Sequence, residues 1–273
     1  MRRSSLANMQ SQIRTASHPS GETIEFHAEP HQYLYNGEAF PSVTKLIHRW
    51  FPEFDAEAVA KKKAQREGGS YEALVREWSK KRDEAAAFGS KVHLMAEKMI
   101  IENDDRVADV LAQNEREQAY LEAVKESLRR IRLGYEVIEP EKIVFSPRLK
   151  VAGTVDLLLR HRTTGEYVIA DWKTNREIKT SAYRQELGSG PCHRIENCNF
   201  NHYSLQVSSY AELLTIEGYL PEAQAVRGVL VHLSDRDGKV TCSYIKTKPF
   251  ALEARSILAA GLIASHDLES VQV

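Results

Sequence analysis

Several of the residues and runs that mark specialised protein classes are scarce in this sequence. Only three cysteines, Cys192, Cys198 and Cys242, occur among its 273 residues, and no two of them form a CxxC pair. This excludes a framework of two disulfides and the usual spacing of a zinc or iron-sulfur site, and it favours a reducing, intracellular compartment. The 14 glycines and 9 prolines are too few for a collagen-like or low-complexity chain. No apolar run approaches the about 18 residues that a membrane helix needs, so we expect no membrane partner.

Neither sign of charge dominates. The chain has 37 Lys and Arg against 38 Asp and Glu, which gives a formal net charge of −1. Overall charge therefore does not attract nucleic acid, and any such binding must come from local patches. Hydrophobic residues make up 42% of the chain and recur throughout it, which excludes disorder for most of its length. The length suits one decorated domain or two small ones, and we expect one.

The first residues differ from the rest in composition. They contain Arg2, Arg3 and Arg14 and several serines, and no acidic residue precedes Glu22. This composition is compatible with a mitochondrial presequence and equally with a flexible terminus. We predict a flexible N-terminus over residues 1–25 and a single domain over residues 26–273. We expect an intracellular location, mitochondrial if the source is eukaryotic and otherwise cytoplasmic or nucleoid.

The order of local patterns predicts a mixed α/β fold. Asn36-Gly37 between two short aromatic runs predicts a hairpin, and Ser42 is placed to cap a short helix. Apolar residues then recur at helical spacing, which predicts a helical portion over residues 42–134. A sheet core over residues 135–250 and a C-terminal helix over residues 249–265 follow. The core should comprise strands near 137–145, 151–160 and 167–173, an irregular insert over 176–201, a helix over 203–217 and a hairpin over 225–245.

Residues 151–175 carry the candidate active site. If the two strands fold about Thr163-Thr164, opposed pairs run from Arg160–Tyr167 to Asp156–Asp171. Opposed Cβ atoms lie about 4.5 to 5.5 Å apart, so the two carboxylates could hold one divalent cation, and Lys173 would share the face of Asp171. Oxygen ligands favour Mg²⁺ or Mn²⁺. A slip of one residue would separate the carboxylates, and an Asp-x-Lys pair by itself is more often a solvated or ion-paired face.

The motifs around these residues resemble a known family. Residues 153–156 (GTVD) and 169–173 (IADWK) resemble the paired motifs of the PD-(D/E)xK nuclease superfamily. Residues 206–210 (QVSSY) resemble the Q-x-x-x-Y helix motif of its RecB-type branch, and residues 89–93 (GSKVH) resemble the upstream motif with its histidine. Within that branch the chain is most similar to the mitochondrial genome maintenance exonuclease family, over roughly residues 40–240. The insert over residues 176–201 does not align.

The resemblance implies a restriction-endonuclease-like mixed sheet core flanked by helices, with an N-terminal hairpin and helical block. It assigns catalytic roles to Asp156, Asp171, Lys173, Gln206 and Tyr210. It assigns the metal, Mg²⁺ or Mn²⁺, to His93, Asp156, Asp171 and the backbone carbonyl of Trp172. The cysteines of cluster-binding relatives are missing, so we expect no iron-sulfur cluster. Glu97 shares a helix face with His93 but is also explained by an i,i+4 pair, and Glu141 could approach the site from the first strand.

DNA would be bound by local basic patches. The candidate residues lie in the helical portion and just after the active strand: Lys61, Lys62, Lys63, Arg66, Lys80, Lys81, Arg176 and Lys179. A solvated helix face is the more common meaning of such a run. We expect a Mg²⁺-dependent deoxyribonuclease, an exonuclease acting on single-stranded DNA or DNA ends in replication, repair or recombination, with proteins of those processes as candidate partners. A structure-specific endonuclease and a non-catalytic DNA-binding module with the same fold remain as alternatives.

Overall fold

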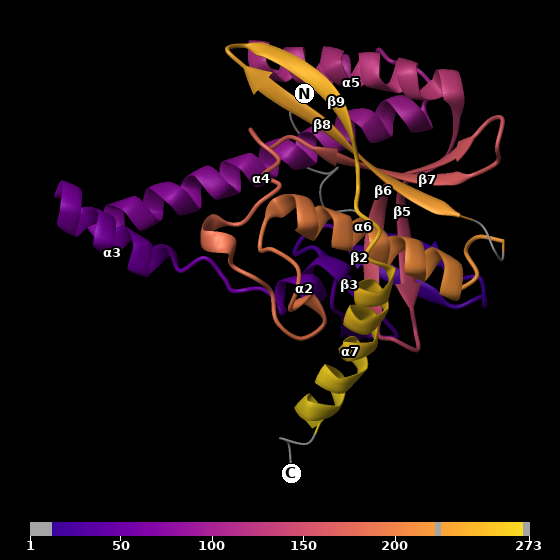
Figure 1. Cartoon of the computed structure of the whole chain (residues 1–273). Coiled ribbons are helices and arrows are strands. Elements are labelled where there is room, and N and C mark those ends of the chain that lie inside the picture. The colour runs from indigo at the N-terminus through magenta and orange to yellow at the C-terminus, as the bar shows by residue number, and fades with distance from the viewer. Residues whose placement is uncertain (1–12, 222–224, 270–273) are drawn as a thin grey trace.

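The computed structural model describes residues 13–221 and 225–269, with side chains described as far as residue 261 (Figure 1). The first half contains β1 (Ile13–Ser17), β2 (Thr23–His27), β3 (Gln32–Tyr35), β4 (Glu38–Phe40), α2 (Val43–His48), α3 (Ala56–Glu67), α4 (Tyr71–Ile101), the 3-10 helix η1 (Asp109–Leu111) and α5 (Glu115–Gly134). The second half contains β5 (Tyr135–Ser146), β6 (Val151–His161), β7 (Tyr167–Lys173), η2 (Tyr183–Gln185), η3 (Gly190–Cys192), α6 (Asn199–Ile216), β8 (Val226–Arg236), β9 (Lys239–Lys246) and α7 (Ala251–Glu269).

A five-stranded mixed sheet forms the centre of the fold. Its strand order is β5-β6-β7-β8-β9, and only the β7–β8 pair, which α6 connects, is parallel. Helices α4 and α5 cover one face, where Leu157 and Trp172 are buried, and α2, α6 and α7 cover the other, where Leu158 and Ile169 are buried. Strands buried on both faces explain the continuous apolar runs of β6 and β7. The predicted mixed α/β core flanked by helices is confirmed.

A second, four-stranded antiparallel sheet precedes the helices, in the order β1-β2-β3-β4. Ile24, Phe26 and Tyr33 of this sheet are buried together with Ile143 and Phe145 of β5. The prediction of a flexible N-terminus over residues 1–25 is therefore wrong for residues 13–25, because β1 pairs with β2 and Ile24 of β2 is buried in the core shared with β5. Residues 1–12 lie outside the described part of the chain. The single-domain organisation stays a prediction.

Local signals correctly placed several element ends. Asn36 and Gly37 form the β3–β4 turn with positive φ values of 49° and 82°, as a tight hairpin requires. Ser42 caps α2, since its hydroxyl accepts a hydrogen bond from the Lys45 amide at 3.2 Å. Helix α6 begins at Asn199, earlier than the expected residue 203.

Among the described helices, none combines the length and apolar character needed to cross a membrane.

Candidate metal centre

The site lies where β6 and β7 separate. The two strands pair from Arg160–Tyr167 to Leu157–Ala170, which is the predicted register. Asp156 and Asp171 are the next residues on each strand. At this point the Asp156 carboxylate accepts a hydrogen bond from the Trp172 amide, with 2.8 Å between Oδ2 and N. The backbone of one strand thus holds the carboxylate of the other at the open end of the ladder.

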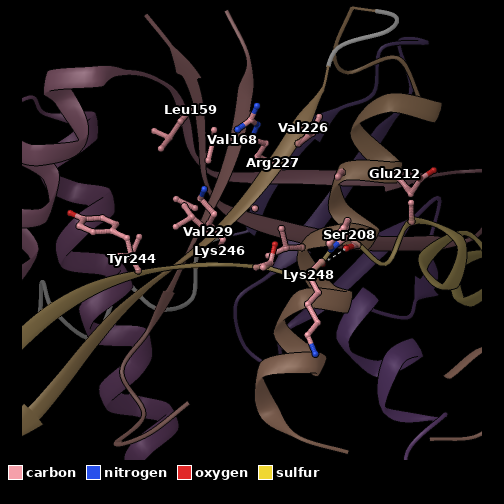
Figure 2. Close-up of a pocket in the computed structure, with 18 of the residues that line it drawn as sticks. Leu159, Val168, Ser208, Glu212, Val226, Arg227, Val229, Tyr244, Lys246 and Lys248 are labelled. Carbon is pink, nitrogen blue, oxygen red and sulfur yellow. Dashed lines mark hydrogen bonds between the residues drawn. The ribbon is translucent and has the colours of Figure 1, made fainter. Parts of the chain in front are cut away.

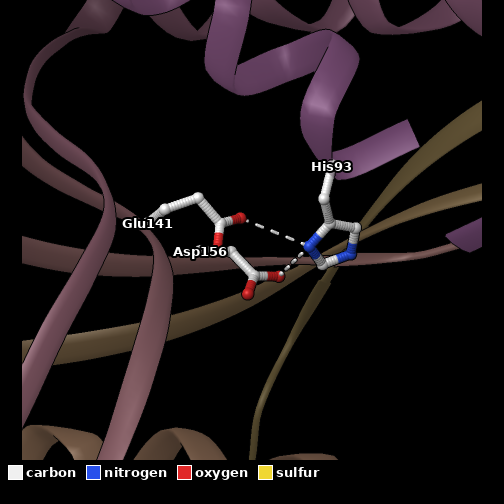
Figure 3. A group of neighbouring side chains, drawn as sticks. All are labelled: His93, Glu141 and Asp156. Atoms are coloured by element: carbon white, nitrogen blue, oxygen red, sulfur yellow. Dashed lines mark ion pairs between the residues drawn. The ribbon is translucent and has the colours of Figure 1, made fainter. Parts of the chain in front are cut away.

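Three side chains from three elements meet at this point (Figure 3). His93 of α4, Glu141 of β5 and Asp156 of β6 each offer a ligand atom, and these atoms lie within 4.8 Å of one another. His93 Nδ1 is 3.4 Å from Glu141 Oε1 and 3.6 Å from Asp156 Oδ2. Its Nε2 lies 3.3 Å from the carbonyl oxygen of Trp172. Three of the predicted metal ligands are therefore neighbours, and Glu141 joins them.

From the sequence, Glu141 was predicted only to be able to approach the site from the first strand. It lies opposite Asp156, since the β5–β6 pairs Pro140–Leu157 and Lys142–Val155 flank it. Its φ of 45° is in the left-handed region, so strict alternation cannot predict where its side chain points. An acidic residue directly after a proline inside a strand was the available signal, because prolines in strands mark edges and bulges.

Asp171 and Lys173 form a buried ion pair beside the cluster. Asp171 is 1% exposed, and its Oδ2 lies 2.5 Å from Lys173 Nζ. Its Oδ1 finds no hydrogen-bond donor among the described residues. A buried carboxylate oxygen without a donor is costly, and a cation would satisfy it. This orphaned oxygen and the oxygen-rich donor set fit a divalent metal, although Asp171 is not in the 4.8 Å cluster of His93, Glu141 and Asp156.

Burial and mutual charge shift the proton affinities of the site. Burial lowers the pKa of His93, but the attraction of Asp156 and Glu141 outweighs it and raises that pKa to about 9. Burial raises the pKa of Asp171 to about 6 against the opposing effect of Lys173. Burial would lower the pKa of Lys173, yet attraction by Asp171 and Asp156 raises it overall. Without a metal, protonated His93 and Lys173 thus offset part of the charge of the three carboxylates.

Helix α6 places the predicted Gln206 and Tyr210 beside the sheet. Gln206 Nε2 donates to the Tyr210 hydroxyl at 3.2 Å, and Tyr210 is 4% exposed. A Cβ on Gly153 would lie 2.5 Å from a Tyr210 ring carbon, so glycine is needed there for close packing. Tyr203, which the sequence argument missed, lies over Lys173, with 4.4 Å from Nζ to the ring centre. Its i,i+3 spacing from Gln206 was the signal that could have identified it.

The predicted DNA-binding lysines lie on α3 and the first half of α4, which extend away from the sheets (Figure 1). Lys61 pairs with Glu57 at 2.6 Å and Lys81 with Glu77 at 2.5 Å, both at i,i+4 spacing. Weaker pairs join Lys63 to Glu67 and Lys80 to Glu84, each at 3.8 Å. Local acids thus neutralise much of the run, as on a solvated helix face. Arg176 and Lys179 are exposed just beyond β7.

A separate cavity of about 890 Å³ lies near α5, α6, β8 and β9. Its walls include Leu159, Val229, Tyr244, Ser208 and Glu212 (Figure 2). Of the residues described as lining it, none belongs to the metal cluster. Ser208 and Glu212, two of the α6 residues that line it, lie two positions after Gln206 and Tyr210, respectively, and thus point to a different side of the helix. The cavity is therefore distinct from the candidate metal centre.

The chain is similar to known nucleases over most of its length. The model of the PD-(D/E)XK nuclease superfamily matches residues 34–256. Among solved structures, a Eubacterium rectale protein described as "Putative exonuclease" is 13% identical to this chain, with a TM-score of 0.33. The match covers 85% of this chain and 74% of the Eubacterium rectale chain. The protein SSO0001 is 12% identical to this chain, with a TM-score of 0.28, and the match covers 64% of this chain and 74% of SSO0001. No curated protein matches. The RecB-type branch and the mitochondrial family stay predictions.

Proposed function

This chain belongs to the PD-(D/E)XK nuclease superfamily, and we propose that it is a metal-dependent DNA exonuclease acting on single-stranded DNA or DNA ends. The observation that carries the proposal is the meeting of His93, Glu141 and Asp156 beside the Trp172 carbonyl and the Asp171–Lys173 pair. Such an activity would serve DNA replication, repair or recombination, with proteins of those processes as candidate partners.

The donors are suited to Mg²⁺ or Mn²⁺. Glu141, Asp156, Asp171 and the Trp172 carbonyl offer oxygen, and His93 offers nitrogen. When bound, such an ion supplies an acidified water and stabilises the charge that develops on the scissile phosphate. The Trp172 amide keeps Asp156 in place through its 2.8 Å hydrogen bond. The acids gathered here leave negative charge that a divalent cation would balance.

Lys173 would act on the phosphate. Its ammonium lies between the Asp171 carboxylate and the face of the Tyr203 ring. The raised pKa keeps it charged at neutral pH, so it can stabilise negative charge on the phosphate oxygens as the bond breaks. Gln206 and Tyr210 would support the same region from α6, where they are hydrogen-bonded to each other. Exposed Arg176 and Lys179 follow Lys173 along the chain and would attract the DNA backbone.

The proposal is tested with labelled linear and circular single-stranded DNA in Mg²⁺, Mn²⁺ or EDTA. Linear DNA should be degraded and circular DNA left intact, and EDTA should stop the reaction. Asp156→Asn and Lys173→Ala should lose hydrolysis while still binding DNA. Asp237→Asn, in the β8–β9 turn, is the matched control and should be fully active. Blocking the 5′ or 3′ end would assign polarity.

Three results would contradict the proposal. Cleavage of the circle would identify an endonuclease. DNA binding without hydrolysis in either metal would identify a binding module that has kept the fold. Equal loss of folding in Asp156→Asn and Lys173→Ala, read by circular dichroism, would show that the acids and the lysine form a structural ion-pair network.

A further inference from the structure

The N-terminal sheet reaches the metal centre through Arg14 of β1. Its Nη2 donates to the backbone carbonyl of Glu141 at 2.9 Å. Its Nη1 lies 3.5 Å from Glu97 Oε1. Glu97 is on α4, one turn after His93. One guanidinium therefore joins the two elements, β5 and α4, that carry two of the three residues of the metal cluster.

The Arg14 hydrogen bond is accepted by Glu141, a residue with an unfavourable backbone conformation. The φ of 45° at Glu141 is in a region that residues other than glycine rarely adopt. Such conformations persist where surrounding contacts hold them, and they are concentrated at functional sites. If Glu141 relaxed to an extended conformation, its carboxylate would change direction relative to His93 and Asp156. The Arg14 hydrogen bond acts on the carbonyl of this same residue.

Attachment of the N-terminal sheet does not depend on Arg14 alone. The Tyr33 hydroxyl lies 2.8 Å from Thr154 Oγ1, and Lys150 pairs with Glu38 at 2.9 Å. Ile24 and Phe26 are buried against Phe145 in the core that the sheet shares with β5. These contacts hold the sheet in place around a side chain that bridges Glu97 and Glu141.

We propose that Arg14 is a positioning residue of the metal centre, fixing Glu141 and the His93 helix relative to each other. The N-terminal sheet is then part of the machinery that builds the site. Arginine suits the role because two nitrogens of its planar group reach two acceptors at once, which a single ammonium cannot do in the same geometry. The inference rests on the proposed function in one respect, since it requires a divalent cation at His93, Glu141 and Asp156.

The experiment measures Mn²⁺ affinity by electron paramagnetic resonance on the full chain without DNA. Loss of outer contacts to metal ligands typically weakens metal binding about 10- to 100-fold. Arg14→Gln should therefore bind Mn²⁺ at least about tenfold more weakly than the wild type, with an unchanged circular dichroism spectrum. Arg14→Lys, which keeps the charge beside Glu97, should also be weakened because it cannot hold both acceptors. Glu38→Gln, which cuts another tie of the same sheet, is the matched control and should bind normally.

A double-mutant cycle tests whether Arg14 influences Mn²⁺ affinity through Glu141. If Arg14 acts through Glu141, Arg14→Gln should add little to the loss caused by Glu141→Gln. Wild-type affinity in a folded Arg14→Gln, or fully additive losses, would overturn the inference and leave the metal centre standing. If Arg14→Gln does not fold, the Mn²⁺ affinity of folded Arg14→Lys is the test instead. Wild-type affinity in Arg14→Lys would then overturn the inference. A wild type that binds Mn²⁺ no better than Asp156→Asn would overturn the metal centre and the role of Arg14 together.

Discussion

The proton on His93 offers a direct test of the metal centre. The imidazole lies beside two carboxylates, 3.4 Å from Glu141 and 3.6 Å from Asp156. Burial lowers the pKa of His93, but the attraction of the two acids outweighs burial and raises the pKa overall, from 6.5 to about 9. A metal ligand must be the neutral imidazole. At pH 7.5 we therefore expect about one proton to be released for each Mn²⁺ that binds.

The same pKa sets the size of two pH effects. Between pH 6.5 and about 9, each unit of lower pH should weaken Mn²⁺ binding about tenfold, because one proton competes with the cation. In the metal-free protein, protonated His93 should therefore stabilise the fold, by about 3 kcal/mol for a pKa raised from 6.5 to about 9. That contribution is fully present below pH 6.5 and is lost as pH rises through about 9. The Tm of the metal-free protein should fall over this range, and that of His93→Asn should fall much less.

Calorimetry at pH 7.5 in HEPES and in Tris measures the released proton, because the two buffers differ in ionisation enthalpy. His93→Asn should release no proton and bind Mn²⁺ weakly. His161→Asn, at the end of β6 beside the β6–β7 turn, is the matched control and should behave as the wild type. Mn²⁺ binding to the wild type without proton release would refute the reasoning, since His93 would then be neutral beforehand or would not be a ligand.

Further predictions concern catalysis, packing and DNA binding. Lys173→Met should lose hydrolysis but bind Mn²⁺ at least as tightly as the wild type, because a buried positive charge is removed; weaker binding would show that Lys173 holds the ligands. Gly153→Ala should reduce the free energy of unfolding by about 1 to 3 kcal/mol in urea, since its Cβ would lie 2.5 Å from the Tyr210 ring. Gly134→Ala, whose Cβ meets nothing within 4 Å, is the control, and equal effects would refute the packing argument. Replacing Lys61, Lys62 and Lys63 by glutamine should weaken DNA binding and reduce its salt slope; an unchanged slope would show that this run faces away from DNA.

The pairing of the active strands followed from local rules. Residues on β6 and β7 alternate faces, and the turn between them pairs Arg160 with Tyr167, so Asp156 and Asp171 had to reach the same end of the ladder. Asn36-Gly37 predicted a hairpin because such pairs accept the positive φ values of a tight turn, and Asp237-Gly238 of the β8–β9 turn also adopts them. Such signals act over a few residues and can be read along the chain.

Amino-acid sequence by itself thus determined the fold class, the β6–β7 register and most residues of the candidate site. Only the tertiary structure decided that Glu141 turns toward His93, that Tyr203 covers Lys173 and that Arg14 reaches the centre from the N-terminal sheet. The Arg14–Glu141 bond joins residues 127 positions apart, and Glu141 departs from the regular strand conformation. Periodicity describes neighbours within one element, whereas these contacts depend on how separate elements pack and on one residue's backbone angle.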